Sequence, residues 1–195
     1  MERSCITSYI IIGNMSDIRY LHNSLLKLSQ RKKTSLKHLA EMFYPEIKNY
    51  DIAGYFYDLQ KNNSREIRFS VKTGAMPHPE IWFHICRKYL TAKIYYFAQE
   101  PNSGNYRTND CAGHYFPQRY IVEDAGGNVN AVVAQQHLYE QVAGIIPVSE
   151  PYTTLEAFAK AIKAKLAGNR IFDILVVDNR GKCISHDKNL ICQWL

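Results

Sequence analysis

The clearest pattern in the chain is a strict alternation of polar and apolar positions over residues 66–72. Strand side chains point alternately to the two faces of a sheet, so this segment is predicted to be a strand with one buried face. Its apolar positions are expected in the core. Its polar positions after Glu66 are Arg68, Ser70 and Lys72, and these side chains are expected to reach solvent.

Strand and helix patterns alternate through the first part of the chain. Ser16 or Asp17 is predicted to cap the first helix and Ser35 the second, because these side chains can accept hydrogen bonds from backbone N–H groups of the first turn. Pro79 is expected in the first turn of the third helix. The predicted elements are a strand over 5–12, helices over 18–28 and 36–43, strands over 54–60 and 66–72, a helix over 79–89 and a strand over 92–99. This order is typical of a split β-α-β unit. The predicted fold class is therefore α+β, a ferredoxin-like antiparallel sheet with helices on one face.

The later part of the chain is predicted to form an extension. Two strands over 105–109 and 114–122 are expected to extend the first sheet as an extra hairpin. The run Gly126-Gly127-Asn128 is the best break in the chain and predicts a first domain over 1–125. Residues 129–195 are then an α+β C-terminal extension packed on that domain. Its expected elements are helices over 130–142 and 155–167, a strand over 171–177 and a hairpin partner over 182–185.

Composition narrows the class of protein. The chain has 195 residues, of which 46% are hydrophobic, so it can bury a core and is not globally disordered. No apolar run reaches the ~20 residues that a membrane helix needs, and the start lacks the features of a secretory signal. The five cysteines are widely spaced and odd in number, which favours reduced thiols. We therefore expect a cytoplasmic protein without a membrane partner.

The charge balance favours an acidic partner. The formal net charge is +6. Five basic residues fall within eleven positions without an acidic residue among them: Lys27, Arg31, Lys32, Lys33 and Lys37. Phosphate neutralisation supplies most non-specific affinity for nucleic acids, so this basic cluster is a candidate phosphate contact. A solvated loop between two helices is the simpler alternative.

The predicted strand over 66–72 offers two more cations, Arg68 and Lys72, which complete seven predicted nucleic-acid contacts. Sheet pleating would place rings of a neighbouring strand beside them, either Tyr95 with Phe97 or Tyr96. Basic groups between aromatic rings on an open sheet suit single-stranded nucleic acid. The alternatives are a sheet face covered by the extension and a protein-binding surface, which the 14 tyrosines would also suit.

A second candidate site lies in the predicted hairpin over 109–119. A carboxylate and an imidazole there are groups that general acid–base chemistry uses. The candidate ligand-site residues are Glu100, Asn109, Asp110, His114 and Arg119. Asn and Asp in such a turn also bond their own backbone, which is the ordinary structural alternative. The sequence has no nucleophile elbow, phosphate-binding loop or paired-histidine helix, so no catalytic residue and no cofactor are predicted.

Two Cys-x-x-His pairs raise the question of a metal. Cys111 with His114 and Cys183 with His186 have a spacing that could complete a tetrahedral zinc site. A cysteine that flanks a strand and a surface histidine give the same spacing by chance. No metal site is therefore predicted.

Residues 65–123 carry a family resemblance. The stretches that carry it are Phe69-Ser70-Val71, Pro77 to Pro79, Cys86-Arg87-Lys88-Tyr89, Tyr95-Tyr96-Phe97-Ala98-Gln99-Glu100-Pro101, Tyr106-Arg107-Thr108-Asn109-Asp110 and Gly113-His114-Tyr115-Phe116-Pro117-Gln118-Arg119-Tyr120. This segment resembles the YubB-type ferredoxin-like family, uncharacterised proteins carried largely on plasmids, phages and related mobile elements. The resemblance implies a ferredoxin-like α/β sandwich and a cytoplasmic setting, and it implies no established activity, cofactor or catalytic residue. The chain departs from the family pattern over 72–76 and 99–104, and the part after Gly127 does not match it.

Together these observations predict a non-enzymatic cytoplasmic accessory protein of a mobile element that binds nucleic acid or another protein. The alternative is a small-molecule enzyme or ligand-binding site at the 109–119 hairpin. An open basic sheet face would favour the first function, and a polar pocket at the hairpin would favour the second.

Overall fold

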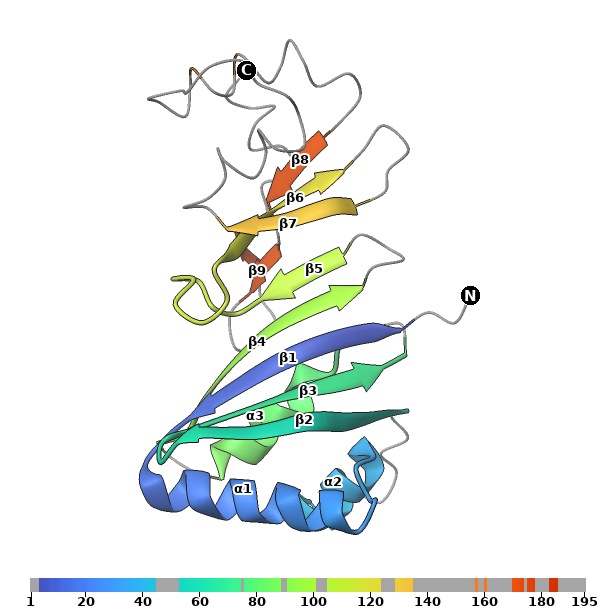
Figure 1. The fold of residues 1–195 in the computed structure, drawn as a ribbon, viewed down its shortest axis with the longest axis vertical. Coiled ribbons are helices and arrows are strands. Elements are labelled where there is room, and N and C mark those ends of the chain that lie inside the picture. Colours follow the sequence, from blue (N-terminus) through green and yellow to red (C-terminus); the bar gives the residue numbers. More distant parts are fainter. Residues whose placement is uncertain are drawn as a thin grey trace. The chain divides into compact units, whose positions relative to one another are not determined.

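A five-stranded antiparallel sheet with three helices forms the first of two units (Figure 1). This computed structural model describes residues 4–44, 53–74, 76–88, 91–100, 105–123, 129–134, 157, 160, 170–173, 175–177 and 183–185. The chain divides into Met1–Asn109 and Asp110–Leu195. The sequence had placed the division at residue 125.

The sheet of the first unit has the strand order β2-β3-β1-β4-β5, and each neighbouring pair is antiparallel. Its strands are β1 (Cys5–Ile12), β2 (Gly54–Asn63), β3 (Glu66–Thr73), β4 (Lys93–Glu100) and β5 (Asn105–Thr108). The chain passes from β1 to β2 through two helices, and from β3 to β4 through a third. The predicted strands of this unit are thus all present, with ends displaced by up to three residues.

Helix starts follow local capping chemistry. α1 (Met15–Gln30) is capped by Asn14, whose Oδ1 accepts a hydrogen bond from the Asp17 backbone N–H at 2.8 Å. The predicted caps Ser16 and Asp17 were therefore wrong, because both lie inside the first turn. The cap at Ser35 is confirmed for α2 (Leu36–Phe43), and α3 (Pro79–Arg87) has proline in its first turn as predicted.

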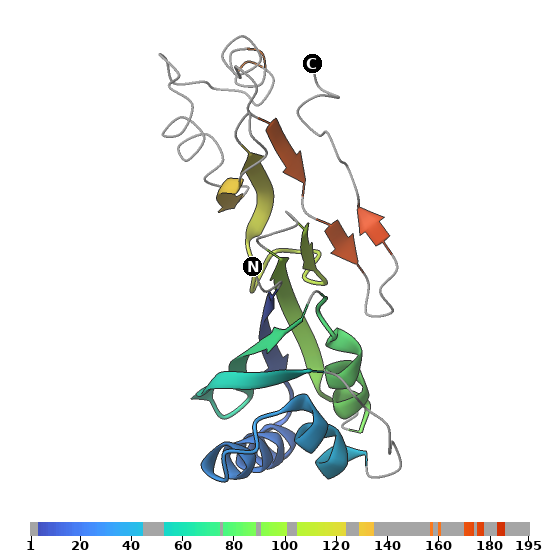
Figure 2. The same ribbon diagram turned by 90° about the vertical axis from the view of Figure 1, so that its right-hand side faces the viewer.

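One face of the first sheet packs against the helices. The apolar residues of β3 are buried, as the alternation predicted. Trp82 of α3 lies against rings from three strands, with centroid distances of 4.3 Å to Phe69, 5.5 Å to Tyr9 and 6.5 Å to Phe56. Figure 2 shows all three helices beside this sheet. The buried rings thus account for several of the tyrosines and phenylalanines that the sequence concentrates here.

The second unit contains a separate three-stranded sheet of order β7-β6-β8. Its strands are β6 (Gln118–Glu123), β7 (Val129–Ala134) and β8 (Arg170–Asp173), and a hairpin of β9 (Leu175–Val177) and β10 (Cys183–Ser185) follows. The prediction that 114–122 extends the first sheet was wrong, because β6 pairs with β7 and β8. β6 also begins only after Pro117, which has no N–H to donate.

The predicted helix over 130–142 was wrong at its start, since 129–134 is a strand. Three valines in this segment favour a strand, and pairing with β6 satisfies its backbone. Residues 135–142 lie outside the described residues. The predicted strand over 171–177 divides into β8 and β9, and the predicted hairpin partner is β10. Of the predicted helix over 155–167, only Ala157 and Lys160 are described, and both are helical.

Across the described residues, no helix is long and apolar enough to cross a membrane.

Candidate functional site

The face of the first sheet opposite the helices carries the predicted cations. We call it the helix-free face: the residues of β3 that lie on it are Glu66, Arg68, Ser70 and Lys72. Each of these side chains is half-buried and alternates with a buried one, so the predicted assignment of the two faces is confirmed. The Arg68 side chain is 44% exposed. The two cations therefore reach solvent on the side away from the core.

Two tyrosines of β2 lie directly beside these cations. Tyr55 faces Lys72 across the β2–β3 pair, and Tyr57 faces Ser70. Tyr55 is 45% exposed, and its ring centroid lies 5.9 Å from that of Tyr57. Burial raises the pKa of Tyr57, and the neighbouring Asp58 carboxylate adds to the shift. Both an exposed ring and a cation are therefore present at the same point of the sheet.

These tyrosines were missed as site residues by the sequence reasoning. The alternation over 54–60 already placed Tyr55 and Tyr57 on one face, but only the register of the hairpin shows that this is the face of Arg68 and Lys72. The turn at 64–65 between β2 and β3 was the available signal, since a short hairpin fixes which residues face each other.

The half of the helix-free face formed by β4 and β5 is less exposed. Tyr95 and Phe97 of β4 lie on this face, and Tyr96 lies on the helix side. Phe97 is 7% exposed and Tyr106 of β5 is 6% exposed, with ring centroids 6.2 Å apart. Phe97 is therefore not available as a stacking ring, whereas Tyr95 is half-buried. The most exposed ring that the structure describes on this face is Tyr55 of β2.

The charges on this face are partly paired. Arg68 Nε donates to Glu66 Oε1 at 2.6 Å, and Asn62 Nδ2 donates to the same oxygen at 3.0 Å. This pair fixes the direction of the guanidinium group and neutralises part of its charge. Lys72 forms no ion pair with any of the described residues, so its full charge is offered to an anion.

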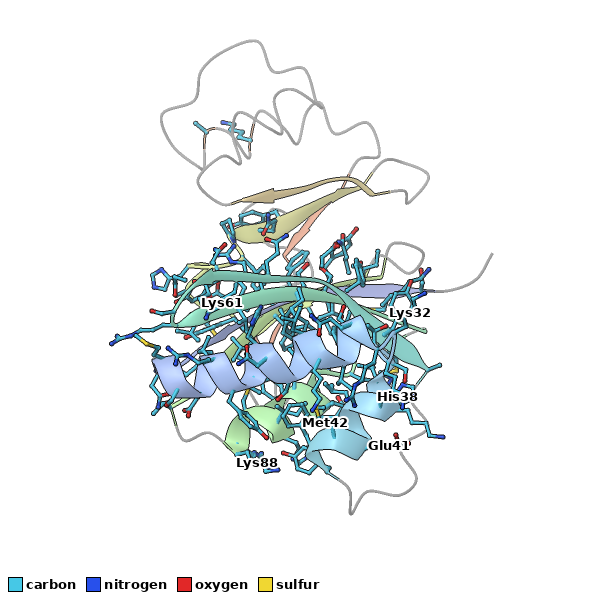
Figure 3. All side chains as sticks on the ribbon, turned by 60° about the horizontal axis from the view of Figure 1, so that its bottom comes forward. Lys32, His38, Glu41, Met42, Lys61 and Lys88 are labelled. Atoms are coloured by element: carbon cyan, nitrogen blue, oxygen red, sulfur yellow. The ribbon has the colours of Figure 1, made fainter. Side chains whose placement is uncertain are left out.

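The basic cluster lies elsewhere, around the C-terminus of α1 and the start of α2. All five of its side chains are exposed. Figure 3 shows Lys32 at the end of α1, where the chain turns toward His38 of α2. The seven predicted contacts thus do not form one surface on the helix-free face: five lie in the helix layer, and Arg68 and Lys72 lie on the sheet.

At the 109–119 hairpin, two of the candidate ligand residues hold the fold together. The Asn109 side chain accepts a hydrogen bond from the Tyr96 backbone N–H and donates one to the Ile94 carbonyl, both at 2.8 Å. One oxygen of the Asp110 carboxylate, Oδ2, accepts hydrogen bonds from the backbone N–H groups of Tyr115 (2.7 Å) and Phe116 (2.9 Å). Both side chains are buried, so the turn-chemistry alternative describes them best.

The structure does not show the other candidate ligand residues of the hairpin beside Asn109 and Asp110. Asn109 closes the first unit and Asp110 begins the second. His114 is exposed in the second unit. The side chains of Glu100 and Arg119 lie outside the described residues.

Replacing Asp110 by alanine is expected to lower the stability of the chain by about 1–3 kcal/mol, because the buried N–H of Phe116 and the partly buried N–H of Tyr115 lose their acceptor. The Asp110→Asn variant should lose much less stability, because an amide oxygen in the position of Oδ2 can accept both hydrogen bonds. Differential scanning calorimetry of the two variants measures the difference. Equal losses in both variants would contradict the role given to Oδ2.

The buried ionisable groups on the helix side are unsuited to acid–base or nucleophilic chemistry. Burial raises the pKa of the Cys86 thiol to about 12, and it raises the pKa of Tyr96 to about 12 as well. Burial also raises the pKa of Tyr9 well above its ordinary value. These three groups stay protonated at neutral pH. No group of three His, Cys, Asp or Glu side chains that could hold a metal ion occurs in the part of the chain that the structure describes.

Comparison with known proteins does not assign this chain to a family. No protein-family model matches the chain, and no significant match occurs among curated proteins or solved structures. The resemblance to YubB-type proteins stays a prediction.

Proposed function

We propose that this chain is a non-enzymatic binding module and that the helix-free face of its first unit binds single-stranded nucleic acid. The binding surface consists of the accessible half of the face, namely Tyr55, Tyr57, Arg68 and Lys72. The role as a cytoplasmic accessory protein of a mobile element belongs to the same proposal and rests on the family resemblance alone.

The observation that carries the proposal is the pairing of Tyr55 with Lys72. A ring that is 45% exposed lies across from a lysine that has no ion-pair partner among the described residues. Unstacked bases gain ~1–3 kcal/mol each by stacking on such rings, and cations neutralise the phosphates between them. A duplex hides its base faces, so the ring is of use only to a single strand.

The same proposal assigns the first unit to the ferredoxin-like class. The order β4-β1-β3-β2, with helices in the β1–β2 and β3–β4 connections, agrees with a split β-α-β unit. The additional helix α2 and the edge strand β5 are departures from the simplest form of that unit. Proteins of this architecture leave one sheet face without helices, which supports a binding role for that face.

The test is a fluorescence-anisotropy titration of the full chain with a labelled oligothymidylate of about 15 nucleotides. Binding is expected to weaken as salt rises, with a slope of log K against log salt of about −0.7 for each neutralised phosphate. The two cations of the site, Arg68 and Lys72, together account for a slope of about −1.4. Absence of salt-sensitive binding at low salt would overturn the proposal.

The small-molecule alternative at the hairpin has less support. It needs the side chains of Asn109 and Asp110 to contact a ligand, whereas both already bond backbone groups. A protein partner on the helix-free face is the remaining alternative. The titration separates it from the proposal, because a surface that only binds protein has no salt-sensitive affinity for the oligonucleotide.

A further inference from the structure

The segment that follows Lys32 and Lys33 of the basic cluster pairs with the backbone at Tyr55 and Phe56, on the outer edge of β2. The Phe56 backbone N–H donates to the Thr34 carbonyl at 3.0 Å, and Ser35 forms an isolated antiparallel bridge with Tyr55. Residues 34–35 thus run beside the edge strand. The basic residue pair just before them, Lys32 and Lys33, is held close to that edge.

Lys32 stands at a position where glycine is favoured. α1 ends with the two hydrogen bonds of a Schellman motif, from Lys33 N–H to the Leu28 carbonyl and from Lys32 N–H to the Ser29 carbonyl, both at 2.9 Å. In this motif the first residue after the helix cap adopts a left-handed backbone conformation. Lys32 occupies that position, with φ 55°. Only glycine takes this conformation without steric cost. The helix end alone therefore does not explain a lysine here.

We propose that Lys32 is a phosphate contact, at which a single strand bound on Tyr55 and Lys72 continues around the β2 edge. The inference rests on the proposed function. Tyr55 faces Lys72 on one side and bridges to Ser35 on the other. The segment that begins at Lys32 therefore reaches the edge of β2 at Tyr55, on the side away from Lys72. A base stacked on that ring has one neighbouring phosphate toward Lys72 and the other toward Lys32. Lys32 is exposed, and its strained backbone is retained because its charge is used.

The Lys32→Gly variant tests the inference because it is expected to raise the stability of the chain while it weakens binding of the oligonucleotide. Removal of the strain should raise Tm by about 2–4 °C. Loss of the cation should weaken binding of the labelled oligothymidylate about 7-fold at about 50 mM salt, and reduce the magnitude of the salt slope by about 0.7. Lys32→Arg keeps the charge and should bind like the wild type.

Asp58→Gly is the matched control, because Asp58 of β2 also has a left-handed backbone, with φ 52°. It should raise Tm without weakening binding, which separates the effect of strain from that of charge. Wild-type affinity in Lys32→Gly, together with weaker binding in Arg68→Ala/Lys72→Ala, would overturn the Lys32 contact and leave the proposed function intact. No binding by the wild-type chain would overturn both.

Discussion

Replacing Asn109 by alanine is expected to lower the free energy of unfolding by about 2–5 kcal/mol. The side chain is 7% exposed and bonds the backbone of β4 twice, at Tyr96 and at Ile94. It thereby continues the β4–β5 pairing past Thr108, the last residue of β5. Alanine leaves a buried N–H and a buried carbonyl without these partners, at a cost of about 1–3 kcal/mol each. Urea unfolding followed by far-ultraviolet circular dichroism measures the loss.

Thr108→Val is the matched control for this prediction. The Thr108 hydroxyl donates to the Tyr96 carbonyl at 2.8 Å, and valine has nearly the same shape without the donor. Loss of the hydrogen bond to the Tyr96 carbonyl is expected to cost about 0.5–1.5 kcal/mol. An Asn109→Ala loss no larger than that of Thr108→Val would contradict the structural role of Asn109 and reopen the hairpin as a ligand site.

The double variant Arg68→Ala/Lys72→Ala is expected to bind single-stranded oligothymidylate about 50-fold more weakly than the wild type at about 50 mM salt. The two cations lie on the helix-free face beside the tyrosine pair, and each is expected to neutralise one phosphate. The magnitude of the salt slope should therefore fall by about 1.4. The anisotropy titration measures both quantities in one series.

Lys61→Ala provides the comparison for charge. Lys61 is an exposed residue of the same hairpin, but it faces Ile67, so it belongs to the opposite face of the sheet (Figure 3). Its loss lowers the net charge without changing the proposed surface, and affinity should change less than about 2-fold. The single variant Lys72→Ala, which removes one of the two cations, is measured beside it and is expected to weaken binding about 7-fold. If Lys61→Ala weakened binding as much as Lys72→Ala, attraction by net charge would explain the affinity, and the helix-free face would not be the site.

The sequence predicted the first unit well because local patterns there agree with the tertiary structure. Apolar and polar residues alternate over 66–72, and one set of them is buried. A period of two is typical of a half-buried strand and not of a helix. Ser35 and Pro79 begin helices for reasons that lie within one turn of the chain. Asn14 was missed because Ser16 and Asp17 are equally good caps, and only the position of the first turn decides among the three.

The second unit and the site depended on contacts that no local pattern contains. Residues 129–134 fit both a helix and a strand, and pairing with β6 selects the strand. The role of Asn109 comes from backbone groups 13 and 15 residues earlier in the chain. A sequence gives the number of cations and not their arrangement, so it could not show that Arg68 lies on the sheet while the basic cluster lies at the ends of α1 and α2.

Photo-crosslinking tests the central claim most directly. An oligothymidylate that carries 5-bromouracil is irradiated in complex with the full chain, and mass spectrometry locates the adducts. Adducts are expected on Tyr55 or Tyr57, where a base stacks beside Lys72. Adducts found only on the helices, with none on β2 or β3, would contradict binding at the helix-free face.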